Sequence, residues 1–323
     1  MMTIAGIIIA IAVVFYLWLN HAYKRTNHYI NPNRDLQSYI KGVPKDIRLA
    51  NFGTTNSYYA FKSHDVLGIN SFNFALNCES VELDLDILKH YASHLAKGCI
   101  VILHLNFCVS IYRRNLLDES RKLWAVLPGK NHINVSFKQR LKHWFPISPF
   151  DIKRMARVFF DVDDNSYENR YYVDAAKAKD IAADMAKCWI NLFHLESMHT
   201  SNLGKANQKE IEFNIAQIEE FIHFCQQHGF YPVIACTPFG KKLNSYVSDE
   251  FDYATLGGIE SKAQKMGVPF FNYRKDERFQ NELSLFMDGC YKMTEHGSKK
   301  YLKILLNDVR DFYHLSVCNQ SLS

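Results

Sequence analysis

Short apolar runs alternate with longer amphipathic stretches along most of the chain, and this alternation limits the fold more than any other feature. The apolar runs are rich in β-branched and aromatic residues, which favours strands. They occupy residues 47–51, 69–74, 99–105, 231–237 and 268–272. The run at 99–105 (CIVILHL) is nearly continuous, as expected for a strand that is covered on both faces.

Helix signals lie between these runs. Ser80 precedes a stretch with apolar residues at helical spacing, so we expect it to cap a helix over residues 80–95. Residues 207–227 form a long amphipathic pattern that ends before a glycine. Further helices are expected at residues 252–265 and 297–313. Strands that alternate with helices in this way predict an α/β fold with a doubly wound, parallel sheet.

The first residues form an uncharged apolar segment. Residues 3–19 (TIAGIIIAIAVVFYLWL) have about the minimum length for a helix that crosses a bilayer, and aromatic side chains cluster at their C-terminal end. The segment lacks a basic flank before it and a small-residue cleavage pattern after it, which disfavours a cleaved signal peptide. We predict a single-pass transmembrane anchor over residues 1–23, with a buried terminal helix as the alternative.

The charges that follow this segment bear on its orientation. Lys24, Arg25 and Arg34 come after it, so the positive-inside rule places the body of the protein in the cytoplasm. The eight cysteines include no C-x-x-C pair, which agrees with a reducing compartment and gives no signal for a zinc or thioredoxin site. Residues 24–46 are polar and predict a linker, and the α/β domain then covers residues 47–323.

The α/β pattern is interrupted at about residues 110–200, which predicts a helical insertion. The first part of this insertion is basic, through Arg113, Arg114, Arg121, Lys122, Lys138, Arg140 and Lys142. The plain interpretation of these cations is a solvated helical face. The alternative is a surface that faces anionic lipid headgroups, or an anionic glycan, next to the anchor.

Composition disfavours several other partners. With 38 basic and 33 acidic residues the net charge is only +5, and no basic run is interleaved with aromatic residues, so we expect no nucleic acid. His90 and His94 lack a third metal ligand. Residues 161–165 (DVDDN) resemble a calcium loop, but the turn glycine and the closing glutamate are missing. We therefore expect no metal ion and no cofactor.

The residues that follow each predicted strand are the first candidates for a site, because ligands of doubly wound sheets bind beyond the carboxyl ends of the strands. These candidate tips are residues 53–57, 73–80, 106–110, 238–242 and 288–297.

The tips carry a resemblance to the SGNH (GDSL-type) hydrolases. The stretch IRLANFGTTNSYYAF looks like their first block, in which a strand ends in Gly-x-Ser. Together with INSFNFALNCESVELDLDILKHY, KGCIVILHLNF and FMDGCYKMTEHGSKKYLKILLNDV, it more closely resembles SGNH-like proteins associated with bacterial surface-polysaccharide biosynthesis, over about residues 47–312. The resemblance implies a three-layer, SGNH-hydrolase or flavodoxin-like fold. It also implies an extracytoplasmic body, which conflicts with the orientation that the flanking charges predict.

The resemblance assigns roles to residues of the first three blocks. Thr55 stands at the nucleophile position of Gly53-Thr54-Thr55-Asn56, where the family has serine. Cys78, or its neighbour Asn77, falls on a glycine whose N–H donates to an oxyanion, and Asn106 falls on the second oxyanion donor. The same cleft is expected to contain Gly53, Thr54, Asn56, Ser57, Asn73 and Tyr291.

The closing block departs most from the family pattern. Asp288 stands at the position of the acid that orients the base, but the usual histidine is replaced by Tyr291 or Lys292, depending on the residue from which the spacing is counted. Tyrosine and lysine side chains have reference pKa values of about 10, so neither accepts a proton at neutral pH unless its pKa is strongly perturbed. His296 is the nearest imidazole, and it or Lys292 would have to serve as the base.

Two functions follow from the resemblance. The first is a membrane-anchored esterase or O-acyltransferase that uses Thr55 on a polysaccharide or an acylated glycan, with a membrane acyltransferase as a further partner. The second is a non-catalytic member of the same fold that binds a glycan or a partner. A structural alternative also stands: residues 54–57 would form a capped turn, Asp288 would pair with Lys292, and Asn106 would bond to backbone at a strand end.

Overall fold

The computed structural model describes residues 2–112, 122–128, 137–148, 150–160 and 174–315. The calcium-like pattern at 161–165 and the arginines at 113, 114 and 121 lie outside the described residues. The chain divides into two compact units. Residues 1–41 and 116–169 form what we call the N-terminal unit, and residues 42–115 and 170–323 form the sheet unit.

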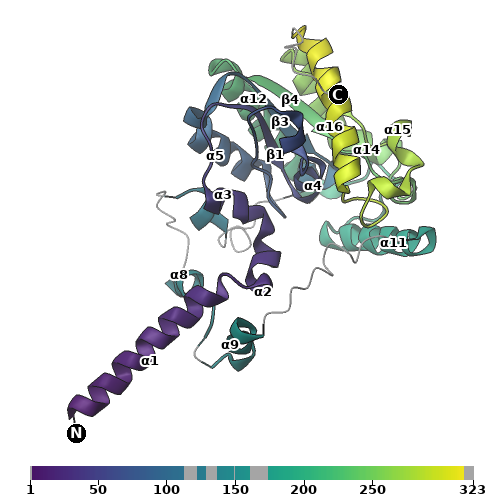
Figure 1. Ribbon diagram of the computed structural model, residues 1–323. Coiled ribbons are helices and arrows are strands. Elements are labelled where there is room, and N and C mark those ends of the chain that lie inside the picture. The colour runs from purple at the N-terminus through teal and green to yellow at the C-terminus, as the bar shows by residue number, and fades with distance from the viewer. Residues whose placement is uncertain (1, 113–121, 129–136, 149, 161–173, 316–323) are drawn as a thin grey trace. The chain divides into compact units, whose positions relative to one another are not determined.

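The sheet unit is built on five parallel strands (Figure 1). They are β1 (Ile47–Gly53), β2 (Ser71–Asn73), β3 (Leu95–Leu105), β4 (Tyr231–Cys236) and β5 (Phe270–Asn272). Their order in the sheet is β2-β1-β3-β4-β5, which is one of the two common orders of doubly wound sheets. The predicted α/β fold with a parallel sheet is therefore confirmed.

The helices cover the two faces of the sheet as this strand order requires. The chain moves in one direction from β1 to β2 and in the other direction from β2 onward, so right-handed crossovers place the helices on opposite faces. One group consists of α4 (Thr55–Ala60) and α16 (Glu295–Tyr313), which contact each other. The other group consists of α5 (Val81–Tyr91), α12 (Gly204–Gln227) and α14 (Asp249–Lys265), in which α12 contacts both neighbours.

Further elements complete the sheet unit. They are the helices α6 (Phe107–Ile111), α11 (Ala175–Leu192), α13 (Lys241–Asn244) and α15 (Glu277–Gln280), and the 3-10 turns His64–Leu67, Ala92–His94 and Leu283–Leu285. α11 was expected within the insertion, but its residues belong to the sheet unit. α11 packs in this unit through aromatic side chains: its Trp189 ring meets the Phe107 ring of α6 edge-on, with 5.0 Å between ring centres.

Side chains that alternate along the strands are buried in a hydrophobic core on each face of the sheet. On the α16 face, Leu49 and Ile102 are fully buried in one cluster with Tyr301. Phe52 points to the other face, since it lies three residues from Leu49. There its ring stacks on the Phe74 ring, with 4.8 Å between ring centres, and meets the Phe221 ring of α12 edge-on at 5.5 Å.

The segment expected as a polar linker is helical. Its turns are α2 (Asn27–Ile30), a 3-10 turn (Asn31–Leu36) and α3 (Gln37–Lys41). Thr26 starts them by accepting a hydrogen bond from the backbone N–H of Tyr29. Asp35 is buried and its carboxylate lies 3.3 Å from the Lys122 ammonium. The segment forms these turns because it packs in the N-terminal unit. Its polar residues alone do not reveal the distant partner Lys122.

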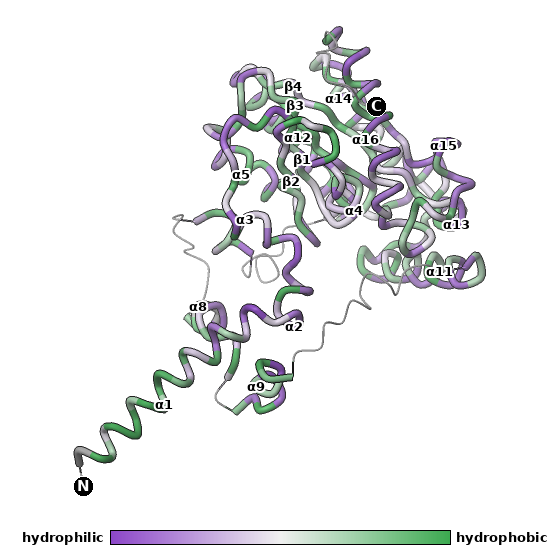
Figure 2. Tube along the Cα trace, viewed as in Figure 1, coloured by the Kyte–Doolittle hydropathy of each residue, from purple (hydrophilic) through white to green (hydrophobic). Residues whose placement is uncertain are grey.

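The N-terminal unit also contains the apolar helix α1 (Met2–Tyr23), together with α8 (Phe137–Trp144) and α9 (Ile152–Phe159). Within α1, Ile4–Tyr23 has a mean hydropathy of 2.1 and is long and apolar enough to cross a membrane. Figure 2 shows the hydrophobic colour along much of this helix.

The glycine at the start of α16 yields a test of the packing. A Cβ at Gly297 would lie 2.2 Å from the carbonyl oxygen of Leu285, which is backbone and has no rotamer to change. We expect Gly297→Ala to lower the free energy of unfolding by about 1–3 kcal/mol, because overpacking a fixed backbone is unfavourable. Denaturant unfolding of the full chain in detergent measures this change.

A second helical glycine is the matched control. A Cβ at Gly258 would meet only the end of the flexible Ile215 side chain, at 2.8 Å. We expect Gly258→Ala to change the stability by less than about 1 kcal/mol, since the gain in helix propensity offsets that adjustment. Equal losses in the two variants would contradict the close backbone approach at Gly297.

Candidate functional site

The carboxyl ends of the strands meet at one edge of the sheet. The backbone N–H of Leu76, after β2, donates to the carbonyl of Gly53 at the end of β1 at 3.0 Å. The side-chain amide of Asn56 donates to the Thr237 hydroxyl, directly after β4, at 2.5 Å. The tips after β1 and β2 are therefore adjacent, as the sheet order requires, and Asn56 reaches the tip after β4 although β3 lies between β1 and β4.

The closing loop joins the same edge. Asn106 follows β3, and its side-chain amide donates to the Tyr291 hydroxyl at 3.3 Å. Asn106 also caps α6, because its Oδ1 accepts the backbone N–H of Val109 at 3.0 Å. The structure thus brings two residues of the predicted site together, and it occupies both polar atoms of the asparagine.

Gly53 shapes the turn from β1 into α4. Its φ of +122° lies in the region that favours glycine, and a Cβ there would lie only 2.5 Å from the carbonyl oxygen of His104. Its N–H donates to the buried Asp84 carboxylate at 2.9 Å. The turn places Thr54 just before α4 and Thr55 as the first residue of that helix.

Thr55 lies at the position that the resemblance gives to the nucleophile. Its side chain is half-buried, and within the described ranges its hydroxyl has no hydrogen-bond partner. The Thr54 side chain makes no capping bond in α4, and its hydroxyl instead lies 3.5 Å from the backbone N–H of Glu79. Among the described residues, no group is placed to accept the proton of the Thr55 hydroxyl.

Asp288 holds its own loop. The side chain is 3% exposed, and its Oδ1 accepts the backbone N–H groups of Cys290, Tyr291 and Lys292 at 3.1, 2.7 and 3.0 Å. This oxygen fixes the turn, and no imidazole contacts the carboxylate in the described coordinates. The expected pairing of Asp288 with the Lys292 side chain is replaced by a bond to the Lys292 backbone.

The candidate bases point to other partners. His296 is 68% exposed and its Nε2 lies 3.3 Å from Glu282 Oε1. The Lys292 ammonium lies 5.7 Å from the centre of the Tyr59 ring, a cation–π distance. Burial, followed by the neighbouring Cys108 thiol, raises the pKa of Tyr291 well above its usual value, so this phenol stays protonated at neutral pH. None of the three described contacts involves Thr55.

The backbone at the predicted oxyanion donor has the conformation of a glycine. Cys78 is exposed and has a φ of +51°, a left-handed value that few non-glycine residues adopt. It stands at the position that the resemblance gives to a glycine, whereas its half-buried neighbour Asn77 does not have this conformation. The Cys78 thiol also lies within electrostatic range of the Tyr291 hydroxyl.

A buried chain of hydrogen bonds lies beneath this edge, on the α16 face of the sheet. His104 is fully buried, with Nδ1 2.5 Å from Asn51 Oδ1 and Nε2 2.7 Å from the Tyr301 hydroxyl. Asn51 in turn donates to Asn73 Oδ1 at 2.7 Å, and Asn73 donates to the carbonyl of Tyr58 at 3.0 Å. We call these groups the buried polar chain.

The partners in this chain fix the protonation of His104. Asn51 Oδ1 only accepts, so Nδ1 carries the proton, and Nε2 accepts the proton of the Tyr301 hydroxyl. Burial raises the pKa of Tyr301 well above its usual value, so the phenol keeps that proton. Burial also lowers the pKa of His104 to about 3, so the imidazole stays neutral.

Ser57 belongs to the same buried polar cluster. Its hydroxyl donates to the carbonyl of Phe52 at 2.9 Å and lies 3.4 Å from His104 Nδ1. Both side chains are fully buried, so no substrate reaches them in this conformation. Sequence reasoning placed Ser57 and Asn73 near the site but missed the roles of Asn51, His104 and Tyr301. Polar residues within otherwise apolar strands were the signal for them, since buried polar groups are almost always hydrogen-bonded.

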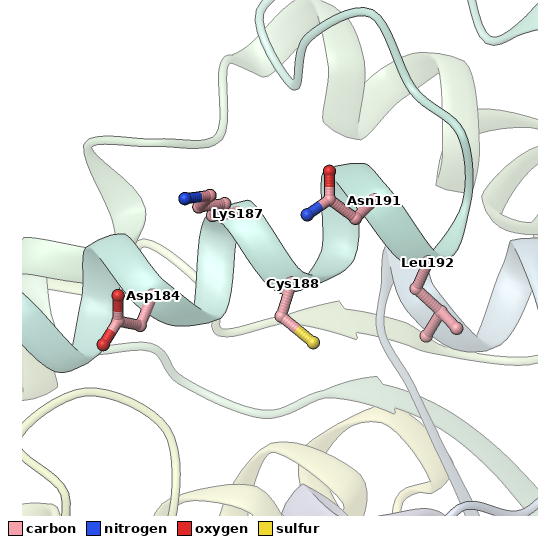
Figure 3. Close-up of a pocket in the computed structure, with 5 residues that line it drawn as sticks. All are labelled: Asp184, Lys187, Cys188, Asn191 and Leu192. Atoms are coloured by element: carbon pink, nitrogen blue, oxygen red, sulfur yellow. The ribbon is translucent and has the colours of Figure 1, made fainter.

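A surface hollow lies apart from the strand ends, on α11 (Figure 3). It has a volume of about 520 Å³ and is lined by Asp184, Lys187, Cys188, Asn191 and Leu192. All five come from one helix, so polar groups of separate elements do not converge there. We assign no site to it.

No protein-family model and no curated protein matches the chain.

The neutral, buried imidazole predicts a pH dependence of stability. In the unfolded chain a histidine has a pKa of about 6.5, and in the folded chain the pKa of His104 is about 3. Between these values only the unfolded chain binds the proton. The free energy of unfolding should therefore fall by about 1.4 kcal/mol for each pH unit below 6.5, through this residue alone.

His104→Gln tests this contribution. Glutamine offers one donor and one acceptor and does not titrate, so we expect its stability to fall less steeply between pH 6 and pH 4 than that of the unchanged chain. Denaturant unfolding of the full chain in detergent at several pH values gives both slopes. His199→Gln, at an exposed imidazole, is the matched control. Parallel slopes in the His104→Gln and unchanged chains would refute a neutral His104.

Proposed function

We propose that the chain is a membrane-anchored, SGNH-like protein of cell-surface polysaccharide biosynthesis or modification that binds a polysaccharide or an acylated glycan without hydrolysing it. The site is the edge of the sheet formed by the tips after β1, β2 and β3 and by the closing loop. The observation that carries the proposal is Thr55. It opens the helix after β1, as a family nucleophile does, but its hydroxyl has no proton acceptor among its described contacts.

The layout of the strand ends supports the relation to SGNH proteins. Cys78 has a left-handed backbone where the related block has glycine, and Asn106 reaches the closing loop through Tyr291. The membrane anchor of the proposal is α1, which is apolar over a sufficient length. The side of the membrane stays a prediction with two opposing arguments, the flanking cations and the resemblance.

The chemistry of the site argues for binding over catalysis. A triad needs a base that titrates near neutrality and an acid that orients it. One oxygen of Asp288 is engaged with three backbone N–H groups, and His296 contacts Glu282 on the surface. The buried His104 has a pKa of about 3 and both of its ring nitrogens are engaged.

Side chains at this edge suit a sugar ligand. Tyr58 and Tyr59 are half-buried, and the Lys292 ammonium lies beside the Tyr59 ring. Aromatic faces pack on the apolar face of a sugar ring, and a cation attracts an acidic group. We propose an acidic or acylated polysaccharide as the ligand and a membrane acyltransferase as a protein partner.

A second candidate function is an esterase or O-acyltransferase that uses Thr55. The observation in its favour is that the Thr55 side chain is half-exposed and its hydroxyl is not engaged within the described ranges. A base would then have to be supplied by His296 or Lys292 after a rearrangement, or by a partner protein.

Two measurements on the full chain in detergent separate the candidates. For the binding protein we expect no turnover of acetyl esters above the uncatalysed rate, and binding of acetylated acidic polysaccharide. Tyr59→Ala and Lys292→Ala should each weaken this binding about tenfold, because each removes a contact of about 1–1.5 kcal/mol. Thr55→Ala should leave binding within about twofold, since it removes only a hydroxyl and a methyl group at the edge of the site.

Tyr253→Ala and Lys303→Ala are matched controls, because both residues are exposed on helices of the sheet unit and neither belongs to the tips after β1, β2 and β3 or to the closing loop. Ester turnover that Thr55→Ala abolishes would establish the enzyme and reject the binding protein. Loss of binding in the control variants as well would reject the assignment of the site.

A further inference from the structure

Two helices of the N-terminal unit carry apolar stripes whose side chains are largely exposed. In α9, Ile152, Met155 and Phe159 follow helical spacing, and Ile152 and Phe159 are 77% and 57% exposed. In α8, the rings of Phe137 and Trp144 are 70% and 50% exposed. Such stripes normally face the interior of a protein.

Cations lie on the other sides of these two helices. Lys153, Arg154 and Arg157 alternate with the apolar stripe of α9, and all three are exposed. Lys138 and Lys142 do the same in α8. An apolar stripe with aromatic residues, opposite a basic face, is typical of helices that lie in the plane of a membrane surface.

Specific contacts fix this part of the chain against the C-terminal half of α1. The Tyr16 ring stacks on Phe145 with 5.9 Å between ring centres, and its hydroxyl donates to the carbonyl of Ile147 at 2.7 Å. The buried side chain of Asn20 accepts the backbone N–H of Ile147 at 2.9 Å. α9 also contacts α1 directly.

The contacts are ordered along the axis of α1. The Phe159 ring lies 6.1 Å from the Trp18 ring. Arg154 and Arg157, on the basic side of the same helix, are within electrostatic range of the Tyr23 hydroxyl. Trp18 and Tyr23 are about 7–8 Å apart along the axis, since a helix rises 1.5 Å per residue.

The same order holds for the segment with α8. Phe145 lies at the level of Tyr16, whereas His143 lies within electrostatic range of Lys24, eight residues further along the chain. Both segments thus present aromatic rings toward the apolar end of α1 and polar or charged groups toward its polar end. This is the gradient that an anchor meets where it leaves a bilayer.

We propose that α8 and α9 lie in the headgroup layer of the membrane that α1 crosses. Their apolar stripes, together with the exposed rings of Phe150 and Phe160, would enter the acyl boundary, and their cations would contact anionic phospholipid. A lipid surface is favoured over a protein partner because the stripes continue the apolar surface of α1 and are flanked by cations. The inference rests on α1 as the membrane anchor, which is part of the proposed function.

Photo-crosslinking of the full chain tests the inference. The crosslinker p-benzoylphenylalanine is placed at Phe150 or Phe160, which are 90% and 75% exposed. The chain is reconstituted in vesicles of phosphatidylcholine and phosphatidylglycerol, and mass spectrometry identifies the adducts. We expect lipid adducts at both positions. Val14 of α1 is the positive reference, and Tyr253, which is 76% exposed on α14, is the negative reference.

The outcomes distinguish a failure of this inference from a failure of the proposed membrane anchor. Lipid adducts at Val14 without adducts at Phe150 and Phe160 would overturn the inference and leave the anchor intact. An absence of adducts at all three would reject the anchor and, with it, the inference. Adducts to a second copy of the chain or to another protein would overturn the inference, because they identify the stripes as a protein interface.

Charge reversal tests the role of the headgroups. In vesicles with phosphatidylglycerol, Lys153→Glu combined with Arg157→Glu should lower the lipid adduct yield at Phe160 several-fold. The same pair should have little effect in phosphatidylcholine alone. Lys177→Glu combined with Lys179→Glu, on exposed positions of α11, is the matched control. An equal yield with and without the reversal in anionic vesicles would overturn the contact with anionic lipid.

Discussion

The buried polar chain is the constraint on which the architecture of the sheet unit depends. It runs from the Tyr301 hydroxyl through His104 and Asn51 to Asn73 and the carbonyl of Tyr58, and so it joins α16, β3, β1, β2 and α4. His104, Asn51 and Asn73 each donate one hydrogen bond and accept another along this chain, and a one-residue slip of β1, β2 or β3 would break these bonds. Because unpaired polar groups in a core are unfavourable, this chain fixes the register of the strands whose ends form the candidate site.

This use of polar side chains limits what the site does. The imidazole nearest to the strand ends is engaged in holding the sheet together, and one oxygen of the Asp288 carboxylate holds a turn. In the SGNH relation that we propose, Thr55, Cys78 and Asn106 would keep family positions, but the described residues do not supply the proton relay that such an enzyme needs. A surface with tyrosine rings and a lysine beside it fits recognition of a glycan better than cleavage of an ester.

The sequence predicts the elements of the sheet well because their signals are local. Nearly continuous apolar runs mark β3 and β4, and Ser80 caps α5 as expected, with its hydroxyl accepting the N–H of Leu83. The pairing of His104 with Asn51 and Tyr301 was not predictable, since it joins residues 53 and 197 positions apart. The turns at residues 27–41 were mistaken for a linker because their partner, Lys122, lies in a distant segment.

The N-terminal unit is built from two separate segments of the chain, and this determines what proteolytic cleavage can release. The chain passes between the two units three times, after residues 41, 115 and 169. Phe145, Ile147 and Phe159 contact α1, so their segment would stay packed on the proposed anchor even when the chain is cleaved after residue 41. A protease that cleaves there would leave the sheet unit covalently joined to residues 116–169, and the noncovalent packing of that segment on α1 would be the remaining link to the proposed anchor. Shedding of a soluble form would need this cut together with dissociation of that segment from α1. A truncation that removes the first 41 residues would uncover Ile147, whose backbone is bonded to Tyr16 and Asn20.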